Sequence, residues 1–151
     1  MRKIRHDIFA KRIRKLRRKN GLTQRKMSRK CKMSFETYTF VETGKTKNPT
    51  VLTVAKIAEV FGVSIDFLIN GVFYTLDYPL KKGKEPDAKL GKMLQRFRLE
   101  KGLTQRKLAD RARVCYGSVC GIEAGRMKNP TIFTMARIAH TLDVTVDEMV
   151  K

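Results

Sequence analysis

Apolar residues recur along this chain at the spacing of short amphipathic helices. Phe9, Ile13 and Leu16 follow the i, i+4, i+7 spacing that places side chains on one face of a helix. The stretch Val54–Phe61 shows a similar pattern, with apolar residues at positions 54, 57, 58 and 61. Both stretches therefore predict helices that each bury one face.

The whole helical pattern occurs twice. The hexapeptide GLTQRK is found as Gly21–Lys26 and again as Gly102–Lys107, 81 positions later. With this offset, Phe9–Asn70 aligns with Leu90–Lys151 over 62 residues without a gap. An ungapped match of this length indicates duplication of one unit. We therefore expect an N-terminal domain over residues 1–71, a linker over 72–88 and a C-terminal domain over 89–151.

Each copy predicts five short helices, so the expected fold class is all-α. The residues that would end or cap these helices stand at equivalent positions: Gly21, Thr23, Gly44 and Ser64 in the first copy, and Gly102, Thr104, Gly125 and Thr145 in the second. Thr145 and Glu148 also have the spacing of a capping box. Short breaks at 32–34 and 113–115 separate the second helix from the third.

The segment between the copies has two parts. Val72–Leu80 is apolar and aromatic, and we expect it to pack on a domain or to form a short strand. Residues 81–87 are polar and contain turn-forming residues, which is typical of a connector.

Charge indicates the kind of partner. The chain has 34 Lys and Arg against 14 Asp and Glu, a net charge of +20. Such an excess destabilises a compact chain by self-repulsion and favours a polyanionic partner. Nucleic acid is the favoured partner and an anionic membrane surface the alternative, although no apolar run approaches the roughly 18–20 residues of a spanning helix. Residues 1–71 carry +13 and residues 72–151 carry +7, so we expect the first copy to bind more strongly.

Several kinds of chemistry are not expected. The three cysteines are Cys31, Cys115 and Cys120, an odd number without a secretion signal, which favours reduced thiols and a cytoplasmic location. His6 and His140 do not complete a zinc-site spacing with them. We expect no metal, no cofactor and no enzymatic activity, because no nucleophile–base set, carboxylate pair or phosphate-cradling glycine loop is found.

One stretch in each copy carries a recognisable motif. LTQRKMSRKCKMSFETYTFVETGKTKNP in the first copy and LTQRKLADRARVCYGSVCGIEAGRMKNP in the second resemble the helix-turn-helix of the phage repressor and Cro family, also called the XRE family. The shared spacing runs from Leu-Thr-Gln through Val/Ile-Glu-x-Gly to Asn-Pro-Thr. The resemblance implies two tandem five-helix domains like those of lambda repressor, and double-stranded DNA as the partner.

The resemblance also implies that Phe35–Glu42 and Tyr116–Glu123 are recognition helices in the major groove. Residues with core spacing point inward, which leaves the others for base edges. These DNA-facing candidates are Phe35, Glu36, Thr37, Thr39 and Phe40 in the first copy, and Tyr116, Gly117, Ser118, Cys120 and Gly121 in the second. Recognition helices more often offer Gln, Arg, Asn or Ser, so whether both domains read bases stays open.

Other positions match family residues that either contact the DNA backbone or form an ion pair inside the domain. A glutamine at the start of the second helix and the loop after the recognition helix contact phosphates. The matching residues are Gln24, Lys45, Lys47 and Asn48 in the first copy, and Gln105, Arg126, Lys128 and Asn129 in the second. Two further pairs match an internal ion pair, so we expect a structural role for them: Arg17 with Glu42, and Arg98 with Glu123.

The repeated hexapeptide departs from many relatives, which have acidic residues after Leu-Thr-Gln. Arg25 and Lys26, like Arg106 and Lys107, oppose the helix macrodipole by about 0.3–1 kcal/mol each. A phosphate docked at the helix N-terminus would reverse this balance, so we predict that the four cations bind DNA. A generally lysine-rich composition is the alternative.

Two turn residues also depart from the family pattern, and two basic segments lie outside the repeated motif. Lys32 and Arg113 stand in the turn where the family often has glycine, so we expect a strained or reshaped turn. The basic stretches at residues 2–5 and 81–84 are candidates for phosphate or minor-groove contacts, or for solvated segments.

These features predict a sequence-specific, double-stranded DNA-binding transcriptional regulator, a repressor that uses two helix-turn-helix domains in one chain. Two alternatives remain. One is a protein-interaction module with an antitoxin-like partner, in which only the first domain binds DNA, and the other is an RNA binder. A protein partner or a homodimer stays open. A dimer is not required for an operator with two half-sites, because one chain already contains two DNA-reading domains.

Overall fold

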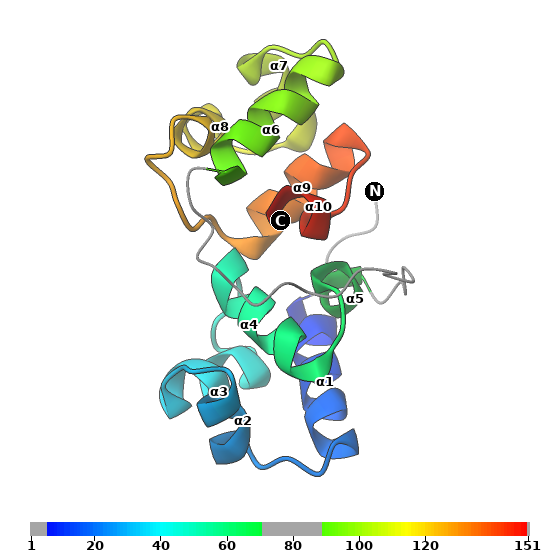
Figure 1. Ribbon diagram of the computed structural model, residues 1–151, viewed down its shortest axis with the longest axis vertical. Coiled ribbons are helices and arrows are strands. Elements are labelled where there is room, and N and C mark those ends of the chain that lie inside the picture. The colour runs from blue at the N-terminus through cyan, green and yellow to red at the C-terminus, as the bar shows by residue number, and fades with distance from the viewer. Residues whose placement is uncertain (1–5, 71–88, 151) are drawn as a thin grey trace. The chain divides into compact units, whose positions relative to one another are not determined.

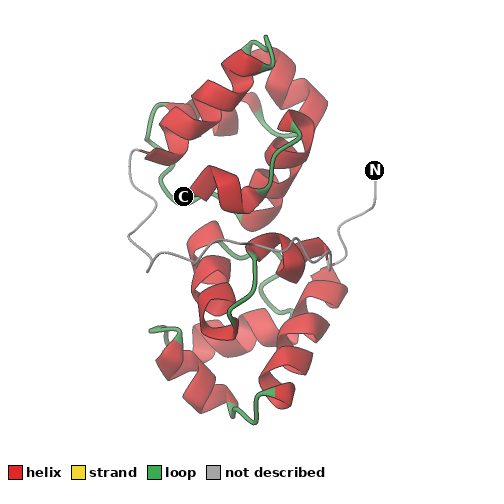
Figure 2. Ribbon diagram, turned by 45° about the vertical axis from the view of Figure 1, so that its right-hand side comes forward, coloured by secondary structure: helices red, strands yellow, loops and turns green. Residues whose placement is uncertain are grey.

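The computed structural model describes residues 6–70 and 89–150, which form ten α-helices in two compact units (Figure 1, Figure 2). The helices of the first domain are α1 (His6–Lys19), α2 (Gln24–Lys30), α3 (Phe35–Thr43), α4 (Val51–Phe61) and α5 (Ile65–Asn70). Those of the second are α6 (Lys89–Glu100), α7 (Gln105–Ala112), α8 (Tyr116–Glu123), α9 (Ile132–Leu142) and α10 (Val146–Val150). The predicted all-α class, with five helices in each copy, is confirmed.

Some predictions fall on residues outside this description. They are the basic arm at 2–5, the linker at 72–88 with its apolar stretch Val72–Leu80, and the basic segment at 81–84. The two domains are described separately below.

Side-chain caps begin the helices where local sequence signals place them. The amide of Lys26 donates to Thr23 Oγ1 at 3.2 Å, and the second domain repeats this bond at 3.1 Å. At the start of α10 the predicted capping box forms. The Thr145 amide donates to Glu148 Oε2 at 2.7 Å, and the Glu148 amide donates to Thr145 Oγ1 at 3.1 Å. Reciprocal bonds of this kind satisfy backbone amides that have no partner within the helix.

The turns that lead into α3 and α8 contain a residue in the left-handed conformation. Lys32 has φ of 50° and Arg113 has φ of 54°. This conformation costs a residue with a Cβ atom roughly 1–2 kcal/mol. The expected strain in the turn is therefore present in both domains, where glycine would adopt the same backbone without it.

Equivalent positions supply the interiors of the two domains. Many buried residues form pairs related by the offset of 81, among them Phe9, Ile13, Met27, Tyr38, Val41, Val54, Ile57 and Leu68 in the first domain, and Leu90, Leu94, Leu108, Val119, Ile122, Met135, Ile138 and Met149 in the second. Every helix contributes at least one of them. The helices α3 and α8 are therefore held from their inner side by apolar packing, and their outer sides remain for other contacts.

The helices α6 and α8 come very close together at Gly91. A Cβ atom at this position would lie 2.4 Å from the carbonyl oxygen of Ile122 and 2.8 Å from that of Glu123. The equivalent residue of the first domain is Ala10, which has room for its methyl group, 3.7 Å from a Cβ built at Gly44. The missing side chain of Gly91 thus sets how near the end of α8 lies to α6.

We expect Gly91→Ala to destabilise the second domain by about 1–3 kcal/mol, because the added methyl group forces α8 away from α6. Thermal unfolding of the whole chain, followed by circular dichroism, measures the change. The matched control is Ala10→Gly, which is expected to lower stability by only about 0.5–1 kcal/mol through helix propensity. A Gly91→Ala protein as stable as the wild type would show that this close approach is not required.

Candidate nucleic-acid interface

A largely buried arginine–glutamate pair joins α1 to α3 in the first domain. Arg17 Nε donates to Glu42 Oε2 at 2.7 Å, and Arg17 Nη2 donates to Glu42 Oε1 at 2.8 Å. Glu42 is only 1% exposed. The remaining terminal nitrogen, Arg17 Nη1, donates to the backbone carbonyl of Leu22 at 2.7 Å. One guanidinium group therefore fixes both α3 and the segment that enters α2.

The second domain builds the same pair from Arg98 and Glu123. Arg98 Nε donates to Glu123 Oε1 at 2.6 Å, Nη2 donates to Oε2 at 2.9 Å, and Nη1 donates to the carbonyl of Leu103 at 2.7 Å. The structure thus brings together all four residues that the resemblance assigns to internal ion pairs. Bidentate geometry of this kind fixes orientation as well as distance.

Two glutamines extend these pairs toward the outer surface. Gln24 Nε2 donates to Glu42 Oε1 at 3.2 Å, and Gln105 Nε2 donates to Glu123 Oε2 at 2.8 Å. An amide nitrogen carries two hydrogens, so each glutamine keeps a second N–H beyond this bond. The two glutamines predicted to contact phosphate are therefore also bound to the buried carboxylates.

The second domain has an additional contact that the sequence did not indicate. Cys120 Sγ donates to Gln105 Oε1 at 3.2 Å, so both ends of the Gln105 amide are held within the domain. Thr39 occupies the position of Cys120 in the first domain. A cysteine is a weak donor, and no spacing rule in the sequence would have linked it to the glutamine.

The ion pair controls the titration of Glu42. Burial alone would raise the pKa of this carboxyl, but hydrogen bonds from Arg17 and Gln24 outweigh burial and lower the pKa below its ordinary value. A carboxylate with a lowered folded pKa stabilises the fold above its unfolded pKa of roughly 4.3. This stabilisation is lost as the pH falls through the lower, folded value, so the pair is intact and charged at neutral pH.

The outer face of α3 is mixed in character. Phe35 is 45% exposed, and Glu36 and Thr37 beside it are also exposed. Thr39 and Phe40 are half-buried. The ring of Phe40 is partly covered, because Lys45 Nζ lies 5.0 Å from its centroid, and the expectation that Phe40 faces DNA stays a prediction. Phe35, Glu36 and Thr37 are therefore the most accessible candidates in the first domain.

The outer face of α8 is narrower than predicted. Tyr116 is 52% exposed, Gly117 is exposed, and Ser118 and Cys120 are half-buried. Gly121 is buried, so the prediction that it faces outward is wrong. A Cβ atom on Gly121 would lie 3.5 Å from the Cβ atom of Met127, which crosses over the helix from the following loop. The exposed Met127 thus covers the surface that Gly121 was expected to present.

The loops that follow α3 and α8 are anchored by equivalent hydrogen bonds. The amide of Thr46 donates to the carbonyl of Phe40 at 3.0 Å, and the amide of Met127 donates to the carbonyl of Gly121 at 2.8 Å. Each loop exposes the residues expected to hold the DNA backbone: Lys45, Lys47 and Asn48 in the first domain, and Arg126, Lys128 and Asn129 in the second. The helices α3 and α8 therefore each end beside two cations and an amide.

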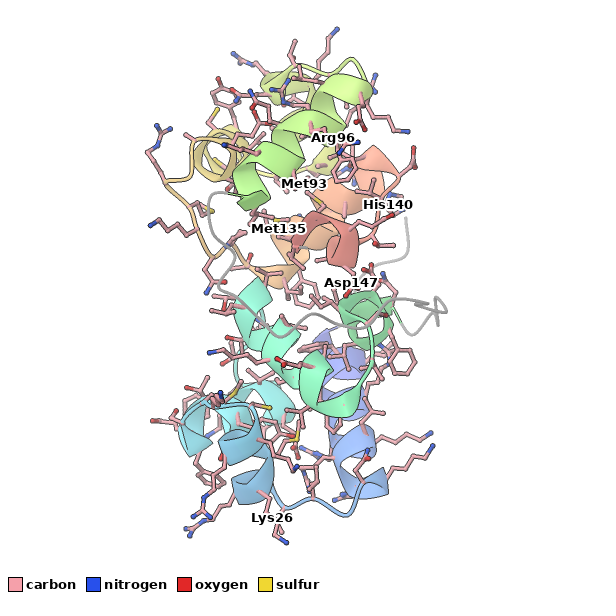
Figure 3. The ribbon with its side chains drawn as sticks, viewed as in Figure 1. Lys26, Met93, Arg96, Met135, His140 and Asp147 are labelled. Carbon is pink, nitrogen blue, oxygen red and sulfur yellow. The ribbon has the colours of Figure 1, made fainter. Side chains whose placement is uncertain are left out.

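A second group of cations lies at the start of α2 and α7. Arg25, Lys26, Arg106 and Lys107 are all exposed, and neither first turn contains an acidic residue. Lys26 projects from α2 into solvent (Figure 3). Each domain thus carries exposed positive charge both where the helix-turn-helix begins and in the loop that follows it.

Other chemistry-bearing groups of the described residues have ordinary surroundings. Burial raises the pKa of the Cys31 thiol to about 12, which makes it an unreactive core residue. His140 is exposed on α9. Within residues 6–70 and 89–150, His, Cys, Asp and Glu side chains do not gather into a metal-binding group of three. Over the same ranges, no helix has the length and apolar character needed to cross a membrane.

Comparison with known proteins assigns the family. A model of the helix-turn-helix family matches residues 13–68 and again residues 94–149, which together are well over half of the chain. The chain therefore belongs to this family, of the XRE type, and contains two tandem domains of it. The protein is a DNA-binding regulator of that type. Neither the curated proteins nor the solved structures contain a match to it.

We expect Glu42→Ala to destabilise the first domain by about 3 kcal/mol or more, because it leaves a largely buried guanidinium group without its counter-ion. Amide hydrogen exchange in α1 and α3 of the whole chain measures the loss. Glu36→Ala, which removes an exposed carboxylate from the same helix, should change stability by no more than about 0.5 kcal/mol. Equal effects of the two substitutions would mean that the pair does not hold α3 in place.

Proposed function

We propose that this protein is a sequence-specific transcriptional repressor whose two domains bind the same DNA duplex, each through its recognition helix. The observation that carries the proposal is that both domains expose cations in the same two places. One place is the first turn of α2 or α7, and the other is the loop after α3 or α8. Binding of a phosphate backbone that runs past the helix-turn-helix requires cations at both places, whereas docking of a protein does not.

A phosphate at the start of α2 or α7 would explain the cations in the repeated hexapeptide. Backbone amides at a helix N-terminus and neighbouring cations attract the same anion. The free N–H of Gln24 or Gln105 would donate to that phosphate, while the other N–H stays on the buried glutamate. Phosphate contact and internal order are thus compatible roles of one side chain.

The two domains would contribute the same kind of affinity and different base preferences. Neutralised phosphates supply sequence-independent affinity, and base-edge contacts from α3 and α8 supply specificity. The accessible residues differ between the helices, with Glu36 in the first and Gly117 at the equivalent position in the second. Repression would be steric, by occupation of an operator.

We expect the duplex affinity of the whole chain to fall steeply with salt, with a slope of log K against log salt of roughly −5 or steeper, since six or more phosphates are neutralised. Fluorescence anisotropy at several salt concentrations measures it. Lys45→Ala combined with Lys47→Ala should reduce the slope by about 2 and weaken binding to all sequences alike. The control is Lys11→Ala combined with Lys15→Ala, which removes the same charge from the exposed side of α1 and should change the slope little.

Three outcomes would contradict the proposal. A slope near zero on duplex DNA would exclude phosphate-driven binding. Tighter binding to structured RNA in direct competition would favour an RNA binder. Absence of duplex affinity, together with one stoichiometric protein partner, would favour an interaction module.

Glu36→Gln is expected to change base preference rather than overall affinity. A carboxylate can accept a hydrogen bond from cytosine N4, whereas a carboxamide pairs best with adenine. Selection of bound sequences from a random duplex pool, for the wild type and for the variant, measures the change. An identical preference would show that Glu36 does not read a base and that α3 contributes less to specificity than proposed.

A further inference from the structure

Both recognition helices begin with an exposed aromatic side chain. Phe35 and Tyr116 stand 81 positions apart and are 45% and 52% exposed. A single exposed aromatic residue is ordinary on a protein surface. Here, however, all six aligned residues of FETYTF and YGSVCG differ, and of these positions only the first is aromatic in both helices. Because an aromatic side chain is kept only at the first position of the two helices, we expect it to have the same role in both domains.

In the first domain the aromatic ring is paired with an arginine of the repeated hexapeptide. The guanidinium carbon of Arg25 lies 5.7 Å from the centroid of the Phe35 ring, within the range of a cation–π contact. Arg106 is the equivalent of Arg25. In the first domain, therefore, the arginine and the ring are neighbours, and Arg106 and Tyr116 stand at the equivalent positions of the second domain.

This pairing gives the arginine of GLTQRK a structural reason to be present. A cation in the first turn of a helix opposes the macrodipole. A planar guanidinium group can stack on an aromatic face while its N–H groups, which lie in its own plane, stay available to a phosphate. Arg25 therefore links the start of α2 to the first residue of α3, and it can hold the Phe35 ring in one position.

We infer that Phe35 and Tyr116 are specificity-determining residues that contact the C5-methyl group of a thymine, at the equivalent position of each half-site. Arg25 is the positioning residue that holds the Phe35 ring. The inference rests on the proposed function and adds to it the identity of one base in each half-site.

The chemistry of the major groove favours thymine over the other bases. Thymine alone among the four ordinary bases presents a methyl group there, and phenylalanine is among the apolar side chains that contact it. The tyrosine ring offers a similar apolar surface. Neighbouring residues such as Glu36 and Gly117 differ, so the two half-sites would share this thymine and differ beside it.

The test uses a duplex that the whole chain selects from a random pool. Each thymine of that duplex is replaced in turn by deoxyuridine, which removes only the methyl group. We expect affinity to fall about fourfold at one thymine in each half-site, the loss expected when one methyl group is no longer buried. Elsewhere deoxyuridine should have little effect.

Substitutions then connect each thymine to its ring. In Phe35→Ala the loss at the first half-site should disappear while the loss at the second persists, and Tyr116→Ala should show the reverse. Phe35→Tyr, which supplies the ring of the second domain, should keep the loss. Arg25→Lys should keep the salt slope, because the charge remains, but should reduce the effect of deoxyuridine, because an ammonium group does not stack as a plane.

The outcomes separate this inference from the proposed function. If the chain selects a defined duplex but deoxyuridine is tolerated at every position, the inference is wrong and the proposed function stands. The same holds if the deoxyuridine effect is unchanged in both alanine variants. If the chain shows no preference among duplexes, both fail. Circular dichroism of each variant checks that it is folded, which is expected because both rings are exposed.

Discussion

The bidentate contact between a largely buried arginine and a largely buried glutamate is the interaction on which each domain depends. Arg17 and Arg98 each bind a carboxylate of the recognition helix and a backbone carbonyl just before the next helix. Desolvation makes such a pair a poor source of net stability, yet removing one partner is strongly destabilising. The pair is therefore best understood as a constraint on orientation. It sets how α3 and α8 stand relative to the helices that precede them.

The constraint extends to the surface through two glutamines and, in the first domain, through Arg25. Gln24 and Gln105 connect the buried carboxylates to the start of α2 and α7. One position further along, Arg25 lies beside the ring of Phe35. The segment repeated as GLTQRK thus links the internal pair to the outer face of the recognition helix. This is a physical reason for the hexapeptide to remain identical in two domains whose recognition helices have diverged.

Much of the fold could be predicted because its signals are local. The five helices of each copy could be predicted from glycines at helix ends, threonine caps and the spacing of apolar residues. The strained turns could be predicted from the positions of Lys32 and Arg113. The remainder depends on side chains that cross between elements. Lys45 lies over Phe40, Met127 covers Gly121, and Cys120 binds Gln105. No periodicity encodes such contacts, since they follow from the path of a loop and the room left by a neighbour.

We propose that both domains bind one duplex and read different sequences. Selection of bound duplexes from a random pool by the whole chain, followed by sequencing, can show this. We expect enrichment of a site with two half-sites of different sequence. A single enriched half-site would show that one domain alone reads DNA, and no enrichment would contradict sequence-specific binding altogether.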